Sequence, residues 1–153
     1  MKVPFSRKSE QGGKAVKGEY QHTVDTKGRL FIPAKLREEL GDSFVVTKGL
    51  DQCLFLYPQN AWEQLEQKIR QLPMSKSRNL QRFFLSSAAD VTVDKQGRIV
   101  VPPVLRAYAK LDHDVTIIGV LERAEIWDRE IWDAYNTQLD TASIALAMEE
   151  LGF

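Results

Sequence analysis

The sequence predicts a mostly β fold with short helices, of the α+β class, formed by two pseudo-symmetric halves of one chain. The main observation is an internal repeat: the segment from Val24 to Arg37 returns 69 residues later, from Val93 to Arg106. Val, Asp, Gly, Arg, Pro, Leu and Arg are identical in the two copies. A half of about 50 residues is marginal alone, so we expect the halves to pack on each other.

The elements of each half follow one order: strand, turn, strand, helix, strand, strand, helix. Alternating apolar residues predict the strands, Asp-x-x-Gly predicts the turn, and Pro33, Pro58 and Pro102 suit the start of helices. In the first half these elements are expected at 20–24, 25–28, 30–32, 33–40, 43–48, 53–57 and 58–71. In the second they are expected at 91–93, 94–97, 99–101, 102–109, 114–119, 124–127 and from about 128.

The domain organisation follows from this repeat. We assign 18–71 to the first repeat and 88–137 to the second, joined by a linker over 72–87. In the linker we expect a loop at 74–78 and a helix at 79–89, with Phe83 and Phe84 partly buried. The flanks are a basic arm over 1–17, of disordered composition, and an acidic helix or tail over 138–153.

Composition bounds the class of protein. The chain has 153 residues, 43% hydrophobic and 27% charged, and no apolar run near the roughly 20 residues that a bilayer requires. A single cysteine, Cys53, excludes a disulfide framework and fits a reducing cytoplasm. The net charge of zero hides an acidic end, since residues 121–153 carry two basic and eight acidic side chains. The basic remainder is compatible with a polyanionic partner.

The repeated turn is the candidate functional element. Asp25 is expected to bond the backbone of its turn, Gly28 to supply a positive φ, and Arg29 to be held by the Asp25 carboxylate. Asp94, Gly97 and Arg98 repeat this set. One interpretation is a well-formed hairpin with a weak surface ion pair. The other is a pair of rigid basic tips that suits a DNA duplex; further basic residues in the turns and following helices favour it, namely Lys27, Lys35, Arg37, Lys95 and Arg106.

The residues that match a known family extend over about 18–138. Besides both Asp-x-x-x-Arg motifs they comprise Gly18–His22, Phe44–Asp51, Cys53–Pro58, Ile117–Val120 and Glu125–Trp127. With these residues the sequence resembles the MraZ family of bacterial transcriptional regulators, built from two SpoVT-AbrB-like repeats. The resemblance implies an AbrB-like swapped-hairpin β-barrel, formed by the two repeats of one chain, and ring-shaped homo-oligomers.

The resemblance also implies a function. Such a protein is a sequence-specific DNA-binding regulator, here expected to be a cytoplasmic, nucleoid-associated repressor. It acts on direct repeats upstream of a cell-division and cell-wall operon, including its own promoter. The DNA-contacting residues transfer to Asp25, Lys27, Arg29, Asp94 and Arg98; we add Lys95 from its place in the second turn, and Lys35, Arg37 and Arg106 as secondary backbone contacts. Gln96 stands where the first copy has Lys27, so the tips should not be equivalent.

Other chemistries find little support. His22 and His113 have no second ligand at metal spacing, and no Ser, Cys and His set or glycine-rich phosphate loop is recognisable. We therefore expect no enzyme, no metal, no cofactor, no small-molecule substrate and no membrane contact. Cys53 is expected in the core, and the three tryptophans are expected in the core or at a subunit interface.

Some alternatives stay open. The arm either adds phosphate contacts or has little function, and the basic stretch 68–82 is either a solvated face or a contact with DNA or an acidic neighbour. Ile144, Met148 and Leu151 form one stripe of the C-terminal helix, which should face away from DNA or pack on a neighbour. The rival to DNA binding is an antitoxin-type interaction or oligomerisation scaffold.

Overall fold

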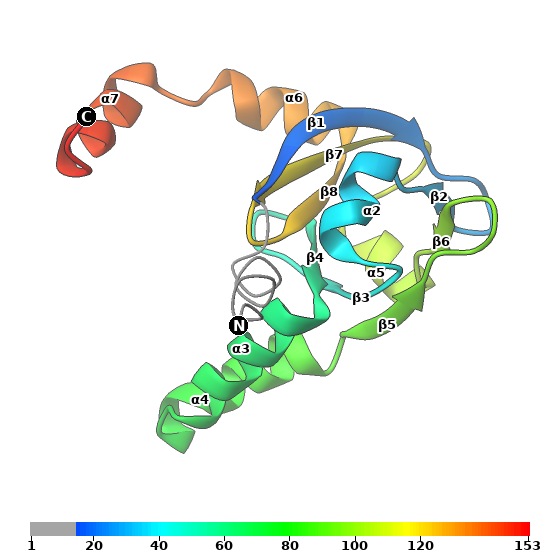
Figure 1. The fold of residues 1–153 in the computed structure, drawn as a ribbon, viewed down its shortest axis with the longest axis horizontal. Coiled ribbons are helices and arrows are strands. Elements are labelled where there is room, and N and C mark those ends of the chain that lie inside the picture. The colour runs from blue at the N-terminus through cyan, green and yellow to red at the C-terminus, as the bar shows by residue number, and fades with distance from the viewer. Residues whose placement is uncertain (1–14) are drawn as a thin grey trace, which may run out of the picture.

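A computed structural model describes residues 15–153 of the chain (Figure 1). Its strands are β1 (Val16–Thr23), β2 (Arg29–Phe31), β3 (Ser43–Lys48), β4 (Leu54–Pro58), β5 (Ala89–Thr92), β6 (Arg98–Val100), β7 (Asp114–Leu121) and β8 (Ala124–Asp128). Its helices are α2 (Ala34–Leu40), α3 (Gln59–Arg70), α4 (Met74–Leu80), the π-helical η1 (Gln81–Leu85), α5 (Pro103–Tyr108), α6 (Arg129–Thr137) and α7 (Thr141–Glu150). The fold is therefore α+β with antiparallel sheets, as predicted.

The two halves exchange their strands. The larger sheet has the order β1-β7-β8-β4-β3-β5, and the smaller one pairs β2 with β6. The first strand of each half thus pairs with the third strand of the other, since β1 runs antiparallel to β7 and β5 to β3. The equivalent pairs β2–β6 and β4–β8 join the halves as well. The expectation of two halves packed as a pseudo-symmetric pair is confirmed.

The core lies where the halves meet. The side chains of Leu30, Ile32 and Leu36 are buried together with their counterparts Ile99, Val101 and Leu105 from the second repeat. A smaller cluster lies on the other side of the sheet and contains Cys53, Phe55, Ile118, Trp127 and Trp132. Apolar residues at equivalent positions of both repeats therefore bury one another, which ties the position of each hairpin to the opposite half.

The linker differs from the sequence expectation. The prediction of a loop over 74–78 is wrong, since α4 begins at Met74. The carbonyl of Pro73 accepts the N–H groups of Lys76 and Ser77 at 2.9 Å each, and these bonds form the first turn of the helix. The predicted helix over 79–89 is shorter, since it comprises the end of α4 and then η1, and β5 begins at Ala89. Phe83 and Phe84 are partly buried, as expected.

The two ends of the molecule differ in character. The β2–β6 ribbon lies at one end, whereas α4 and α7 extend from the opposite side (Figure 1). The arm predicted over 1–17 is too long, because β1 begins at Val16, whose side chain is buried, and includes Lys17. Residues 1–14 of that arm lie outside the described residues. Within 15–153, no helix has the length and apolar character needed to cross a bilayer.

Strand exchange makes a prediction for the isolated first repeat. A fragment of residues 15–71 lacks the partners of β1 and β2, so it cannot complete its sheets as a monomer. We expect it to fold only when two copies exchange strands, and its melting temperature to rise with fragment concentration. Thermal unfolding at several concentrations, with sedimentation to measure mass, checks this. A folded monomeric fragment would contradict the interpretation.

Candidate nucleic-acid interface

The candidate site is the outer face of the β2–β6 ribbon. In its register Leu30 pairs with Ile99, and both side chains are buried. Because successive side chains of a strand point to opposite faces, the neighbouring pairs Arg29–Val100 and Phe31–Arg98 lie on the outer face. Both arginines are therefore on one face of one ribbon, related by the pseudo-twofold axis at the Leu30–Ile99 pair.

The first turn holds its arginine through Asp25. The Asp25 Oδ1 atom accepts the N–H groups of Lys27 at 3.0 Å and of Arg29 at 2.8 Å. Its Oδ2 atom accepts Arg29 Nε at 2.6 Å. The terminal Nη groups of Arg29 have no hydrogen-bond partner within 15–153, and its side chain is 38% exposed. One carboxylate thus shapes the turn and fixes the guanidinium, which keeps donors available for a ligand.

The second turn repeats this geometry. The Asp94 Oδ1 atom accepts the N–H groups of Gln96 at 2.8 Å and of Arg98 at 2.9 Å, while Oδ2 accepts Arg98 Nε at 3.2 Å. The Arg98 side chain is 33% exposed. The sequence expectation that each aspartate bonds its turn and holds its arginine is therefore met at both tips.

These bonds keep the two carboxylates ionised. The backbone N–H of Arg29 is the main cause that lowers the pKa of Asp25, and its guanidinium adds to the effect. The backbone N–H of Arg98 likewise lowers the pKa of Asp94, with Gln96 and the Arg98 side chain contributing. Donors that bond the charged form of an acid lower its pKa. Both tips therefore hold their arginines throughout the neutral range.

The tips are also tied to the opposite half. The Ile32 N–H donates to the Gly97 carbonyl at 2.9 Å, and the Val101 N–H donates to the Gly28 carbonyl at 2.8 Å. Gly28 has a φ of 85°, and a Cβ there would lie 2.7 Å from the Val101 carbonyl oxygen. Only glycine permits both this backbone conformation and this close approach. The hairpins are thus held together at their turns.

Arg106 and Arg37, both predicted as secondary contacts, occupy equivalent positions with different surroundings. Arg106 donates from Nε to the Val101 carbonyl at 3.0 Å and from an Nη group to the Thr26 carbonyl at 3.5 Å, so it braces the first turn. The Nε of Arg37 is buried without a hydrogen-bond partner in the described part of the chain. Lys35 is exposed on α2, and Lys27 and Lys95 are exposed in the turns.

Two exposed residues of this face were missed by sequence reasoning. Phe31 and Val100 are 40% and 56% exposed on the same face as the arginines. In the sequence they are the middle residues of apolar triplets, Leu30–Ile32 and Ile99–Val101, which do not reveal which member is outward. The signal that could have placed them is the alternation of strand side chains, once Arg29 and Arg98 are taken as outward.

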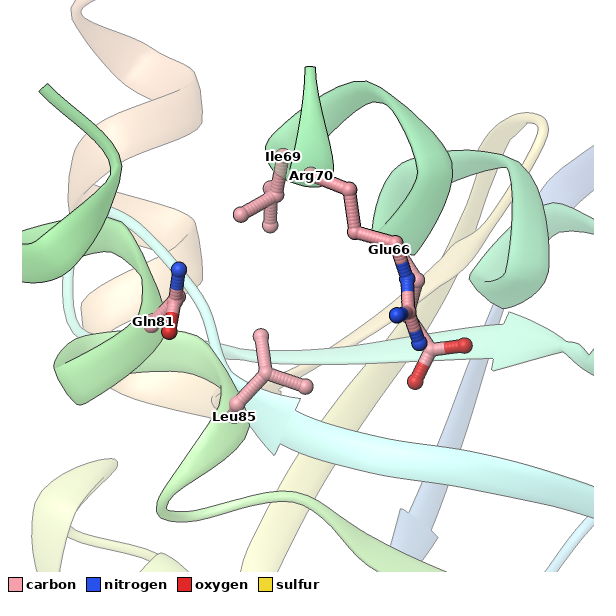
Figure 2. Close-up of a pocket in the computed structure, with 5 residues that line it drawn as sticks. All are labelled: Glu66, Ile69, Arg70, Gln81 and Leu85. Atoms are coloured by element: carbon pink, nitrogen blue, oxygen red, sulfur yellow. The ribbon is translucent and has the colours of Figure 1, made fainter. Parts of the chain in front are cut away.

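The other candidates lie apart from this face. Cys53, Trp62, Trp127 and Trp132 are buried, and burial raises the pKa of the Cys53 thiol, which disfavours its nucleophilic thiolate form. No group of three or more metal-ligating side chains is found among the described residues. A hollow of about 260 Å³ lies between α3 and η1, where Ile69 and Leu85 face the gap and Glu66, Arg70 and Gln81 surround it (Figure 2). This hollow lies at the end of the molecule that contains α3 and α4, away from the β2–β6 ribbon (Figure 1).

The ribbon face has a charge and hydrogen-bond donors that suit a polyanion. It presents two guanidinium groups that are each held by an aspartate and whose Nη groups have no hydrogen-bond partner among residues 15–153, and exposed lysines in both turns. A guanidinium whose orientation is already fixed loses less conformational freedom when it binds. A nucleic acid, whose phosphates are regularly spaced, is a ligand that suits such a face.

Comparison with known proteins agrees with the repeat structure. The chain matches the family model described as "MraZ protein, putative antitoxin-like" twice, over residues 15–83 and 84–151. These matches cover both halves and the helical linker.

Curated relatives give the same family. The protein of Desulforamulus reducens is 53% identical over 85% of this chain and 93% of its own length. That of Natranaerobius thermophilus is 53% identical over 89% and 96%, and that of Heliobacterium modesticaldum is 58% identical over 78% and 85%. Each is named "Transcriptional regulator MraZ". The chain, with its two exchanged repeats, belongs to the MraZ family.

Proposed function

We propose that this chain is a sequence-specific DNA-binding regulator of transcription and that the outer face of the β2–β6 ribbon contacts the duplex. The observation that carries the proposal is the placement of Arg29 and Arg98 on one face of one ribbon, each held by its own aspartate. The relatives are named transcriptional regulators, which supports the same function.

The roles of the residues follow from their contacts. Arg29 and Arg98 contact base edges or phosphates with their free Nη groups, since a two-stranded ribbon fits the major groove. Lys27 and Lys95 neutralise phosphates from the exposed turns. Asp25 and Asp94 orient the arginines, and Arg106 acts as a positioning residue through the first turn. Lys35 and Arg37 are secondary candidates for backbone contacts.

The biological target is inferred from the family resemblance. We infer that the chain acts as a repressor at direct repeats upstream of a cell-division and cell-wall operon, its own promoter included, and so works in the cytoplasm at the nucleoid. We also infer that the exchanged sheets close into an AbrB-type barrel. The pairing of β1 with β7 and of β5 with β3 supports that architecture.

Assembly into a ring-shaped homo-oligomer is part of the proposal. α7 is exposed along its whole length and presents Ile144, Leu146 and Met148 to solvent. Apolar helix surfaces of this kind are typical of contacts with another chain. The stretch 68–82 has five basic side chains and no acidic one, which complements the acidic C-terminal end of a neighbour. Both surfaces lie away from the β2–β6 ribbon (Figure 1).

The scaffold alternative would not need two intact tips. A protein that only holds partners together has no reason to keep both Asp–Arg pairs in matching geometry, yet both are present. A pull-down with and without nuclease separates the two functions, because partners held through DNA are released on digestion.

The first prediction concerns the arginines. Replacing Arg29 and Arg98 together with Ala is expected to lower affinity for the chain's own promoter fragment by at least about 30-fold, since each bidentate arginine–base pair is worth roughly 1–3 kcal/mol. The slope of the logarithm of the binding constant against the logarithm of the salt concentration should also become shallower, by about 0.9 for every phosphate that is no longer neutralised. Equilibrium binding at several salt concentrations measures both.

A charge-conserving control accompanies this variant. Replacing both arginines with Lys keeps the charge but removes the planar fork and the Nε that binds the aspartate. It should retain the salt slope while the sequence preference becomes weaker. Normal promoter binding by the double Ala variant, with unchanged solution mass, would show that the site lies elsewhere.

The second prediction concerns the aspartates and pH. The pKa values of Asp25 and Asp94 are lowered by folding, so their support of the tips is complete at neutral pH and is lost as pH falls through the lowered values. Protonation of these two carboxylates should therefore not change promoter affinity above about pH 4. Replacing both with Asn keeps an oxygen for the turn N–H groups but removes the charge. It should reduce affinity several-fold at pH 7 without unfolding the chain.

The third prediction concerns assembly. A chain ending at Thr137 lacks α7 and should have a smaller solution mass. Its affinity for a single repeat should be unchanged, whereas affinity for a promoter with several repeats should fall by about 10²-fold or more, because linked contacts raise effective concentration. Replacing Glu149 and Glu150 with Lys should weaken assembly in the same direction. An unchanged mass would exclude α7 from the interface.

A further inference from the structure

We propose that Phe31 and Val100 form an apolar subsite that contacts the 5-methyl groups of thymine in the major groove. The proposal rests on the DNA-binding function above and adds a readout that neither arginine supplies. Phe31 pairs across the ribbon with Arg98, and Val100 pairs with Arg29. Each apolar side chain is therefore the direct cross-strand neighbour of an arginine on the exposed face.

The first step is that this apolar surface is preorganised. The Phe31 ring lies against the His22 ring, with centroids 5.3 Å apart. It also covers Gly97, where an added Cβ would lie 2.9 Å from a ring carbon. Phe31 nevertheless remains 40% exposed. Its position is fixed by its neighbours while part of the ring stays accessible, so contact with a ligand costs little conformational entropy.

The second step concerns the chemistry of the partner. The apolar side chains of Phe31 and Val100 lie next to two guanidinium groups. Such a face fits a polyanion that also presents apolar groups beside the groups that the arginines bind. In the major groove, thymine is the base that presents a methyl group, and apolar side chains including Phe contact it. The arginines and the apolar pair are then complementary: the former bind phosphates or hydrogen-bonding edges, and the latter bind methyl groups between them.

The third step is that the face is not symmetric. The pseudo-twofold axis relates Phe31 to Val100 and Lys27 to Gln96, so a large ring on one side corresponds to a small side chain on the other. The larger contact surface of Phe31 should make one half of the bound site more dependent on thymine. The face therefore gives the bound DNA a direction, which a symmetric pair of tips would not.

The experiment compares the chain's own promoter fragment with the same fragment carrying uracil in place of thymine, which removes only the methyl groups. The wild-type chain should bind the uracil fragment about fourfold more weakly for each methyl group that the subsite covers, the effect of one buried methyl-sized group. Phe31→Ala should lose most of this difference between the two fragments. Val100→Ala should retain most of the difference, because Val100 offers less surface.

Val104→Ala is the matched control. Val104 is exposed on α5, outside the ribbon, and its replacement should leave the preference for thymine unchanged. The comparison of fragments in the wild-type chain does not depend on the folding of any variant.

Three results overturn the proposal. Equal wild-type affinity for both fragments excludes methyl contact. In that case, weaker binding by Phe31→Ala assigns Phe31 a structural or wedge role instead. A preference that Phe31→Ala and Val100→Ala both retain in full places the methyl contact on other residues. If the wild-type chain binds both fragments equally while the double arginine variant still loses binding, the proposed function stands without this subsite. If the wild-type chain binds neither fragment, both the subsite and the proposed function are overturned.

Discussion

The pairing of β2 with β6 is the constraint on which the candidate site depends. Each of these strands has three residues, which is too short to hold a hairpin tip in place alone. Their register puts Leu30 against Ile99 in the core and thereby turns Arg29 and Arg98 to the same side. A slip by one residue would bury both arginines and expose both core residues. The burial of one apolar pair therefore fixes the orientation of the charged face.

Much of this was predictable because the relevant contacts are local. The Asp-x-x-Gly-Arg spacing brings the carboxylate and the guanidinium together across one turn, so Asp25–Arg29 and Asp94–Arg98 could be expected from the sequence alone. The strand and helix order followed from the repeat. The segment 74–78 is helical and not a loop, because Pro73 suits the position that precedes a helix, whereas polar composition alone favours a loop.

The features that could not be predicted involve residues far apart in the sequence. Arg106 reaches the carbonyl of Thr26 across 80 positions, so its bracing of the first turn depends on the strand exchange. The exposure of Phe31 and Val100 depends on the β2–β6 register in the same way. An apolar triplet next to an arginine is compatible with either face being buried. The outward placement of the neighbouring arginine, which the β2–β6 register establishes, decides which residue remains on the surface.

The arrangement of the molecule also explains why assembly and DNA contact need not compete. One chain offers two arginines and two turn lysines, a small set for specific binding in physiological salt, because each neutralised phosphate contributes a salt-sensitive term. In the proposed function, affinity therefore comes from several chains acting together. That requires an assembly surface which leaves the ribbon uncovered, and α7 lies at the opposite end (Figure 1). An oligomer built through α7 would keep every ribbon available, so modest single tips would suffice once they are linked.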